Sequence, residues 1–286
     1  MIRRAAWAGQ FYEYSAEDLR RSIEECFLSR LGPGRLPSVP EKRTGQVLGI
    51  VSPHAGYVYS GPGAANAFCA LAEDGLPRVA VIIGPKHRYG GADVAVDTSE
   101  AWATPLGTVA VDQETCQAIL QRAPFAEADP SAHAQEHSLE VQVPFLQFVG
   151  GEAVSIAPIA VGLPPYGGTA RIARELGLAI ADAIRDRDAV VIASTDLTHY
   201  ESETSAKEKD SLAIAAIENL DAEDLLKTVS SHGISMCGAV PTAVAIEACR
   251  ALGASRAELL SYFSSGETTG DRSSVVAYGA LKIVRG

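Results

Sequence analysis

The sequence has little positive charge and no basic cluster. Its 286 residues include 24 Lys and Arg against 35 Asp and Glu, which gives a formal net charge of −11. Proteins that bind duplex nucleic acid carry a basic patch, so we expect no duplex nucleic-acid partner. No apolar run approaches the length of a membrane span, and Arg3-Arg4 is followed by Ala-Ala-Trp-Ala-Gly instead of a signal-peptide core. We therefore expect no membrane segment and no signal peptide.

Cysteine is scarce, and no Cys-x-x-Cys pair occurs. The absence of that pair argues against a zinc knuckle or a thioredoxin-type motif. His-Glu-x-x-His and the G-x-x-x-x-G-K-[S/T] phosphate loop are absent too, so the chain is neither a zincin nor a P-loop protein. Scattered thiols fit a reducing compartment, and we expect a cytoplasmic protein. Four of the five cysteines lie in helical patterns and are expected to pack in the core, namely Cys26, Cys69, Cys116 and Cys249.

What the sequence does contain is three short apolar runs that each lead into polar residues. Residues 47–51, 79–83 and 189–193 are rich in β-branched side chains and are bounded by Gly, Pro and polar residues. This pattern predicts strands that are buried on both faces of a sheet. In open parallel sheets, ligands bind outside the carboxyl ends of the strands. The residues that follow the three runs should therefore meet in one pocket.

Predicted strands and helices alternate along the chain. The hydrophobic fraction is 47% and the charged fraction 21%, as in ordinary globular proteins. We expect an α/β fold with one domain over residues 1–286, in which a mixed, largely parallel sheet lies between layers of helices. Pro158 places the strand 155–161 near a sheet edge. The expected helices span residues 15–30, 62–72, 112–121, 136–148 (where Pro144 can kink or split it), 168–186, 204–218, 221–229 and 239–252.

Histidine and aspartate follow the three buried strands. His54 and His87 come directly after the first two, and a neutral imidazole is both a common metal ligand and a competent base. Asp196 and His199 follow the third strand. If that loop turns into a helix, these two residues share a face, and the carboxylate can orient the imidazole. Asp196 is also a good helix N-cap residue, and both roles are compatible.

Cys237 precedes a predicted helix in a tight-turn context. A thiol at a helix N-terminus has a lowered pKa and more thiolate character. Beside these residues, His137 and Glu140 are expected next to the site, where they can contact a substrate, while His133 is expected to face solvent. Tyr57, like Phe11 and Tyr12, can line a ligand pocket, although aromatic residues also pack in cores.

Several motifs, in this order, resemble the Memo family (mediators of cell motility), whose prokaryotic members are called AmmeMemoRadiSam system protein B. The resemblance covers nearly the whole chain. It rests on Pro53-His54-Ala55-Gly56-Tyr57 with Tyr59-Ser60-Gly61, Gly84-Pro85-x-His87, Thr104-Pro105-Leu106-Gly107, Glu136-His137-Ser138-Leu139-Glu140, Ser194-Thr195-Asp196-Leu197-Thr198-His199-Tyr200 and Cys237-Gly238.

The resemblance implies a fold similar to the LigB-like class III extradiol dioxygenases, which are non-haem iron enzymes. It also implies that His54, His87 and Cys237 are the metal ligands, with Asp196 and His199 beside them. The expected metal is iron or copper, with zinc possible. Those dioxygenases use a carboxylate where this chain has a thiol, and a thiolate favours Cu(I) or zinc over a plain oxygenase iron site. Assigning a ring-cleaving activity to this chain would therefore rest on the fold alone, and a fold does not fix function.

Three functions remain open from the sequence. In a metal-dependent redox enzyme, His199, oriented by Asp196, would be the general acid/base. In a metal-free hydrolase or transferase, Cys237 would attack and His199 would be its base. In a binding module or metal carrier, the pocket would hold a small molecule or peptide without turnover, working with a radical-SAM partner of the AmmeMemoRadiSam system. The two strand-end histidines have no task in the hydrolase, which favours the metal site.

Overall fold

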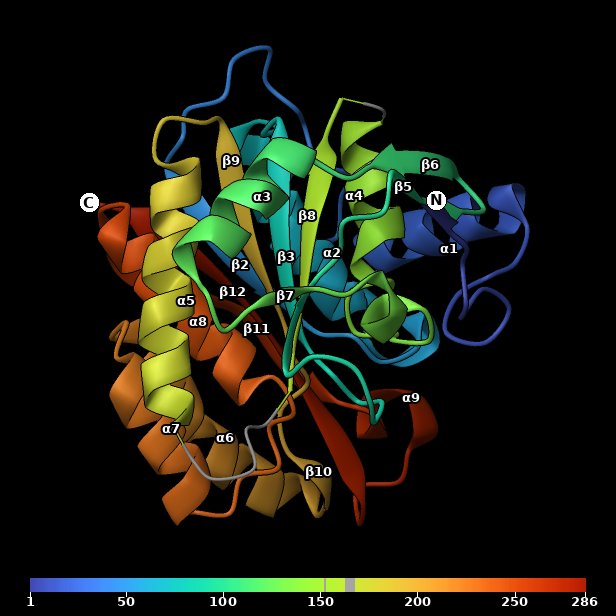
Figure 1. The fold of residues 1–286 in the computed structure, drawn as a ribbon. Helices are drawn as coiled ribbons and strands as arrows, with labels where there is room; N and C mark the ends of the chain where they lie inside the picture. The colour runs from blue at the N-terminus through green and yellow to red at the C-terminus, as the bar shows by residue number, and fades with distance from the viewer. Residues whose placement is uncertain (152, 163–167) are drawn as a thin grey trace.

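Four parallel strands form the centre of the main sheet. The computed structural model describes residues 1–151, 153–162 and 168–286. Strands β2 (Val47–Ser52), β9 (Ala189–Ser194), β3 (Val79–Pro85) and β8 (Ser155–Val161) lie side by side in that order (Figure 1). Their residues are almost all buried, as the β-branched runs predict. Because the strands are parallel, the ends of β2, β3 and β9 lie at one edge of the sheet.

Antiparallel strands extend the sheet on both sides. On one side β12 (Val275–Arg285) pairs with β2, and both β11 (Ala254–Ser264) and β10 (His199–Glu201) pair with β12. On the other side β4 (Val94–Val96) pairs with β8 and carries β7 (Glu127–Ala128). Within the described residues the sheet has nine strands and is mixed. This arrangement confirms the predicted α/β class with helices flanking a mixed sheet.

A second, small sheet joins the start of the chain to its middle. Strand β1 (Ile2–Arg3) runs parallel to β5 (Ala101–Thr104), which forms a hairpin with β6 (Gly107–Ala110). The pairing of β1 with β5 places Arg3 over the buried ring of Trp102, at 4.1 Å from the ring centroid.

Helices cover both faces of the main sheet (Figure 1). Helices α1, α2 and α4 pack together on one face, and α3, α5, α7 and α8 pack on the other. Helix α6 lies against β11 and β12. The bounds are α1 (Ala16–Leu28), α2 (Tyr57–Asp74), α3 (Gln113–Arg122), a 3-10 turn (Pro130–His133), α4 (Gln142–Gly150), α5 (Thr169–Ile184), α6 (Glu203–Glu218), α7 (Ala222–Ser231), α8 (Ala239–Ala251) and α9 (Gly266–Thr269). None of the helices that the structure describes is long and apolar enough to cross a membrane.

Two proline-based expectations are wrong. Pro158 does not mark an edge strand, since β8 pairs with β3 on one side and β4 on the other. The Pro158 carbonyl accepts from the Asp97 N–H at 3.0 Å, just where β4 ends. The missing proline N–H therefore removes only one backbone hydrogen bond from the sheet. Residues 136–141 form turns in place of a helix, and Pro144 lies in the first turn of α4, where its missing N–H is tolerated.

Helix α2 begins five residues before the expected start at Pro62, since its first residue is Tyr57. Pro62 therefore lies inside the helix and cannot donate to the carbonyl of Val58. The hydroxyl of Thr268 donates to that carbonyl at 3.3 Å and replaces the lost bond. The early start matters for the site because it places the His54 loop directly at the N-terminal end of α2.

Two glycines let loops approach the strand ends closely. A Cβ on Gly84 would lie 2.8 Å from Ser138 Oγ and 2.9 Å from the Leu139 side chain, so only glycine admits the 136–139 turn beside β3. A Cβ on Gly238 would overlap the carbonyl oxygen of Ser194. Gly238 thus lets the Cys237 turn contact the end of β9, as close approaches of backbone require.

Candidate metal centre

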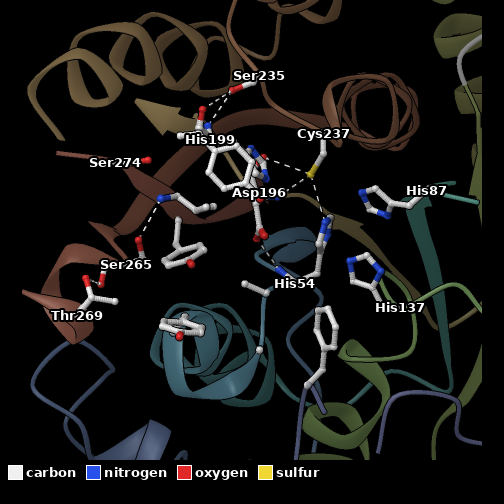
Figure 2. A pocket seen from close by; sticks show the side chains of 17 residues that line it. His54, His87, His137, Asp196, His199, Ser235, Cys237, Ser265, Thr269 and Ser274 are labelled. Carbon is white, nitrogen blue, oxygen red and sulfur yellow. Dashed lines mark hydrogen bonds between the residues drawn. The ribbon is translucent and has the colours of Figure 1, made fainter. Parts of the chain in front are cut away.

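The residues after the three buried strands do meet in one pocket. A cavity of about 660 Å³ opens at the carboxyl edge of the sheet. Figure 2 shows His87 and His137 on one side of it and Ser265, Thr269 and Ser274 on the other. All but two of the predicted site residues line this cavity, namely His54, His87, His137, Asp196, His199 and Cys237.

His54 is buried and held in one tautomer by the strand beside it. Its Nδ1 lies 2.9 Å from Ser194 Oγ. The Ser194 hydroxyl donates to the carbonyl of Ser138 at 2.6 Å and accepts from Gln142 Nε2 at 2.8 Å. With its only proton committed to Ser138, Ser194 must accept from His54 Nδ1–H. The unprotonated nitrogen of His54 is therefore Nε2, which points toward Cys237.

Glu136 holds the other two histidines. Its carboxylate accepts from the backbone N–H of His87 at 2.6 Å and lies 2.9 Å from His87 Nδ1. The same carboxylate oxygen lies 3.4 Å from His137 Nδ1. Burial alone would raise the pKa of Glu136, but the hydrogen bond and charge of His87 prevail and lower it to about 2. Glu136 is therefore ionised at neutral pH and orients the Nε2 side of both rings away from itself.

His54, His87 and His137 form a compact cluster. Each offers one ring nitrogen, and these nitrogens lie within 4.8 Å of one another. The rings of His87 and His137 stack with centroids 4.5 Å apart. Burial lowers the pKa of His54 well below its usual value and that of His137 to about 4, so both imidazoles are neutral at pH 7. Neutral imidazole is the form that binds metal ions.

Cys237 lies beside this cluster, but its thiol is not activated. Its Sγ is 3.2 Å from His54 Nε2, and the backbone N–H of Asp196 donates to it at 3.3 Å. Burial and the nearby charge of Asp196 raise the pKa of the Cys237 thiol. The expectation of a lowered pKa at a helix N-terminus is therefore wrong, because desolvation outweighs the helix.

Asp196 and His199 line the pocket without forming the expected pair. Residues 195–198 have no helical structure, and His199 begins β10. The Asp196 carboxylate accepts from the backbone N–H of His54 at 2.7 Å, and no hydrogen bond to His199 occurs within the described residues. Burial raises the pKa of Asp196 to about 6, against the effect of that hydrogen bond. His199 Nδ1 is buried without a partner in the described part of the chain.

Three residues have places other than those expected. Tyr57 is buried and donates to the carbonyl of Val141 at 2.7 Å, so it belongs to the core, while Tyr59 lines the pocket. Glu140 is buried and forms an ion pair of 2.7 Å with Arg3, away from the cavity. His133 is fully buried and bonds to the carbonyl of Ala95, which corrects its expected exposure.

Sequence reasoning missed the residues that support the histidines. Glu136 stands in a recognised motif, but from the sequence it looks like one more charged residue on an amphipathic helix. The structure has no helix at this position. Ser194 and Gln142 carry no local signal at all. Their roles arise from the alignment of β9 with β2 and from the start of α4, which only the three-dimensional arrangement shows.

The donor set fits a metal ion. Two of the three clustered imidazoles have Nδ1 in a hydrogen bond to a fixed oxygen, of Ser194 for His54 and of Glu136 for His87, as metal-binding histidines usually do. Imidazole nitrogens suit iron, copper and zinc, and the adjacent thiol adds a soft donor that favours Cu(I) and zinc.

The architecture and this pocket together define an α/β protein with a histidine cluster at the strand ends of its mixed sheet. The family model described as "Memo-like protein" matches residues 3–282. The chain therefore belongs to the Memo-like family. It is 46% identical over 288 residues to a MEMO1 family protein of Methanopyrus kandleri, with 100% of each chain covered. It is 44% identical to one of Methanothermobacter thermautotrophicus, covering 98% of this chain and 100% of the relative.

A bacterial relative and a solved structure extend the comparison. A MEMO1 family protein of Thermotoga neapolitana is 41% identical, with 97% of this chain and 98% of the relative covered. The crystal structure of an uncharacterized protein from Escherichia coli K12 is similar with a TM-score of 0.54 and 13% identity, over 82% of this chain and 99% of that one. At this identity the likeness concerns the fold alone.

Proposed function

We propose that the pocket is the site of a metal-dependent redox enzyme, in which His54, His87 and His137 hold a metal ion. The observation that carries the proposal is the cluster of three ring nitrogens within 4.8 Å. Cys237 Sγ, in contact with His54 Nε2, adds a fourth donor. The predicted set of His54, His87 and Cys237 is thus extended by His137. Iron and copper are the proposed metals, with zinc as a redox-inert substitute.

A bound redox metal would supply Lewis acidity and electron transfer at this point of the cavity. The chain's own residues would supply the proton chemistry. Asp196 can hold a proton on its carboxylate near neutral pH, because burial raises its pKa to about 6. His199 adds an imidazole to the lining of the same pocket. His54 and Asp196 are almost fully buried and are therefore shielded from bulk water.

The contact between Cys237 and His54 also favours a second candidate, a metal-free cysteine hydrolase. In it His54, and not His199, would be the base, since Nε2 lies 3.2 Å from Sγ and is unprotonated. Against it stands the raised pKa of the thiol, which keeps the nucleophile neutral. His87 and His137 again have no task in such an enzyme. The metal-dependent function accounts for all of these residues.

Oxygen uptake separates these functions. The protein is purified without oxygen, reconstituted with Fe(II) or Cu(I), and mixed with a panel of catechols in an oxygen electrode. Metal-dependent O₂ consumption that is lost in His54→Asn and retained in His232→Asn supports the redox enzyme, because His232 lies at the end of α7, away from the pocket. Stoichiometric metal without O₂ consumption supports a metal carrier. Turnover of a substrate by protein that holds no metal would overturn the proposal.

A further inference from the structure

The cavity is much larger than a metal ion needs. Its volume of about 660 Å³ falls in the range of pockets that hold small organic molecules. Figure 2 shows that it continues from the histidine cluster past His199 and Asp196 to Ser265, Thr269 and Ser274. The chemical groups at this far end therefore indicate which kind of molecule can bind next to the metal site.

The far end offers hydroxyl groups. Ser265 Oγ accepts from the backbone N–H of Val276 at 3.1 Å, which fixes the oxygen and leaves its proton free to donate into the pocket. Ser274 Oγ makes no hydrogen bond to the described residues and can donate or accept. Ser235 Oγ, nearer the middle, accepts from the backbone N–H of His199 at 2.7 Å. These hydroxyls match uncharged oxygen or nitrogen atoms of a ligand.

The far end has no positive charge to bind an anion. Among the described residues, no Lys or Arg lines the cavity, and Asp196 is its one carboxylate. Two basic groups outside the lining are already paired. Arg272 binds Glu203 and Glu267, and Lys209 binds Glu201 at 2.6 Å. A phosphate or carboxylate placed here would gain no ionic partner from the residues that line the cavity.

Aromatic side chains also line the cavity, among them Tyr59, Tyr200 and Tyr278. Tyr200 has a φ of 60°, the left-handed region that bulky residues rarely adopt, and it stands in an irregularity of the β10–β12 pairing. Strained residues of this kind persist where the surroundings hold them, often at ligand sites. The strain keeps a largely exposed ring at the pocket wall, where it can contact a flat or apolar body.

We infer that the substrate is an uncharged organic molecule with a metal-binding group at one end, an apolar or aromatic body, and a hydroxyl or amide group at the other end. The inference rests on the proposed metal site and extends it. The metal-binding group lies at the histidine cluster, the body lies against the tyrosines, and the distal group bonds to Ser265 and Ser274. Molecules with a distal phosphate or carboxylate are excluded.

The test uses two probes that differ only in the distal group, which is an alcohol in one and its phosphate ester in the other. One is the hydroxamate of para-(hydroxymethyl)phenylpropanoic acid, and the other is its phosphate monoester. Acetohydroxamate, which reaches only the metal, is the reference. Binding to the Zn(II)-loaded full chain is measured by calorimetry. We expect the hydroxyl probe to bind at least about 10-fold more tightly than the phosphate probe, because no basic residue of the lining pairs with the phosphate.

Variants locate the distal contact. Removing two hydrogen bonds in Ser265→Ala/Ser274→Ala should weaken the hydroxyl probe by about 5-fold or more and leave acetohydroxamate unchanged. Ser274→Arg should reverse the preference in favour of the phosphate. Ser273→Ala is the matched control, because Ser273 bonds to Asp271 and does not line the cavity.

The outcomes separate the inference from the function on which it rests. If the chain binds neither zinc nor acetohydroxamate, the metal site itself is wrong and the inference falls with it. If acetohydroxamate binds but the phosphate probe binds as tightly as the hydroxyl probe, the metal site stands and the substrate class is wrong. An unchanged affinity of the hydroxyl probe in the double variant also overturns it.

Discussion

Ser194 Oγ lies 2.9 Å from His54 Nδ1 and, through the proton it gives to Ser138, leaves Nε2 as the unprotonated nitrogen of that histidine, which is the nitrogen available to the proposed metal. Ser194→Ala should therefore lower metal affinity about 10- to 100-fold, the usual effect of losing an orienting partner. Competition with a chromophoric chelator measures it. Ser52→Ala is a matched control, because Ser52 pairs in register with Ser194 and its buried hydroxyl has no partner among the described residues. Equal affinities in both variants would contradict the assigned tautomer.

Glu136 should make the metal-free protein sensitive to acid. Its folded pKa of about 2 lies below the usual value of 4.5, so its contribution to stability is present above pH 4.5 and is lost as the pH falls toward 2. Glu136→Gln should thus destabilise the protein by up to about 3 kcal/mol at pH 7. The difference from wild type should shrink below pH 4.5.

Urea unfolding at a series of pH values measures this difference. Glu114→Gln is the control, because the Glu114 side chain is 83% exposed and pairs only at the surface. The free energies of unfolding of wild type and Glu136→Gln could instead differ by a constant amount from pH 7 to pH 3. That result would show that the contacts with His87 do not lower the pKa of Glu136.

Arg3 and Glu140 form a buried ion pair, with side chains 4% and 1% exposed. Arg3→Met leaves the Glu140 charge without its partner and should cost about 3–5 kcal/mol in the free energy of unfolding. Arg3→Met/Glu140→Gln should cost less than the sum of its two single changes, because the charge is removed together with its partner.

Denaturant unfolding of the three variants tests this pair. Arg21→Met is the matched control, since the Arg21–Asp18 pair is exposed at 59% and 50% and should contribute less than about 1 kcal/mol. A loss in Arg3→Met as small as that of Arg21→Met would mean that the start of the chain does not anchor the 136–140 turn.

The Cys237 thiol should react slowly in the metal-free protein. Its raised pKa leaves little thiolate at pH 7.5, so alkylation by iodoacetamide should be slower than that of free cysteine under the same conditions. Mass spectrometry follows the reaction, with Cys237→Ser as the blank, since the other four cysteines are buried. Selective alkylation faster than that of free cysteine would support the hydrolase instead.

The sequence predicted the architecture and the strand-end residues well, for a physical reason. Runs such as residues 79–83 are buried on both faces of the sheet, so their apolar composition alone identifies them as strands. Parallel strands must also present their carboxyl ends at one edge of the sheet. His54, His87 and Cys237 could be chosen in this way and by resemblance. Ser194 and Gln142 could not, because their contacts with His54 depend on register between strands and on where α4 begins.

Two other errors have the same origin. Glu140 and Tyr57 stand in the motifs, yet both point into the core, where Glu140 pairs with Arg3 from the distant start of the chain. Periodicity over residues 136–148 suggests a helix, but the turn at 136–141 is held by Glu136 and by close packing on Gly84. Local pattern does not report such long-range contacts.

Metal content of purified variants tests the central claim most directly. Wild type, His54→Asn, His87→Asn, His137→Asn and Cys237→Ala are reconstituted anaerobically with Fe(II), Cu(I) or Zn(II), desalted and measured by elemental mass spectrometry, with the exposed His232→Asn as control. The account predicts near-stoichiometric metal in wild type and His232→Asn, loss in the three histidine-cluster variants, and a weakened preference for Cu(I) in Cys237→Ala. Wild type that binds no metal, or a His54→Asn variant that binds as wild type does, would contradict it.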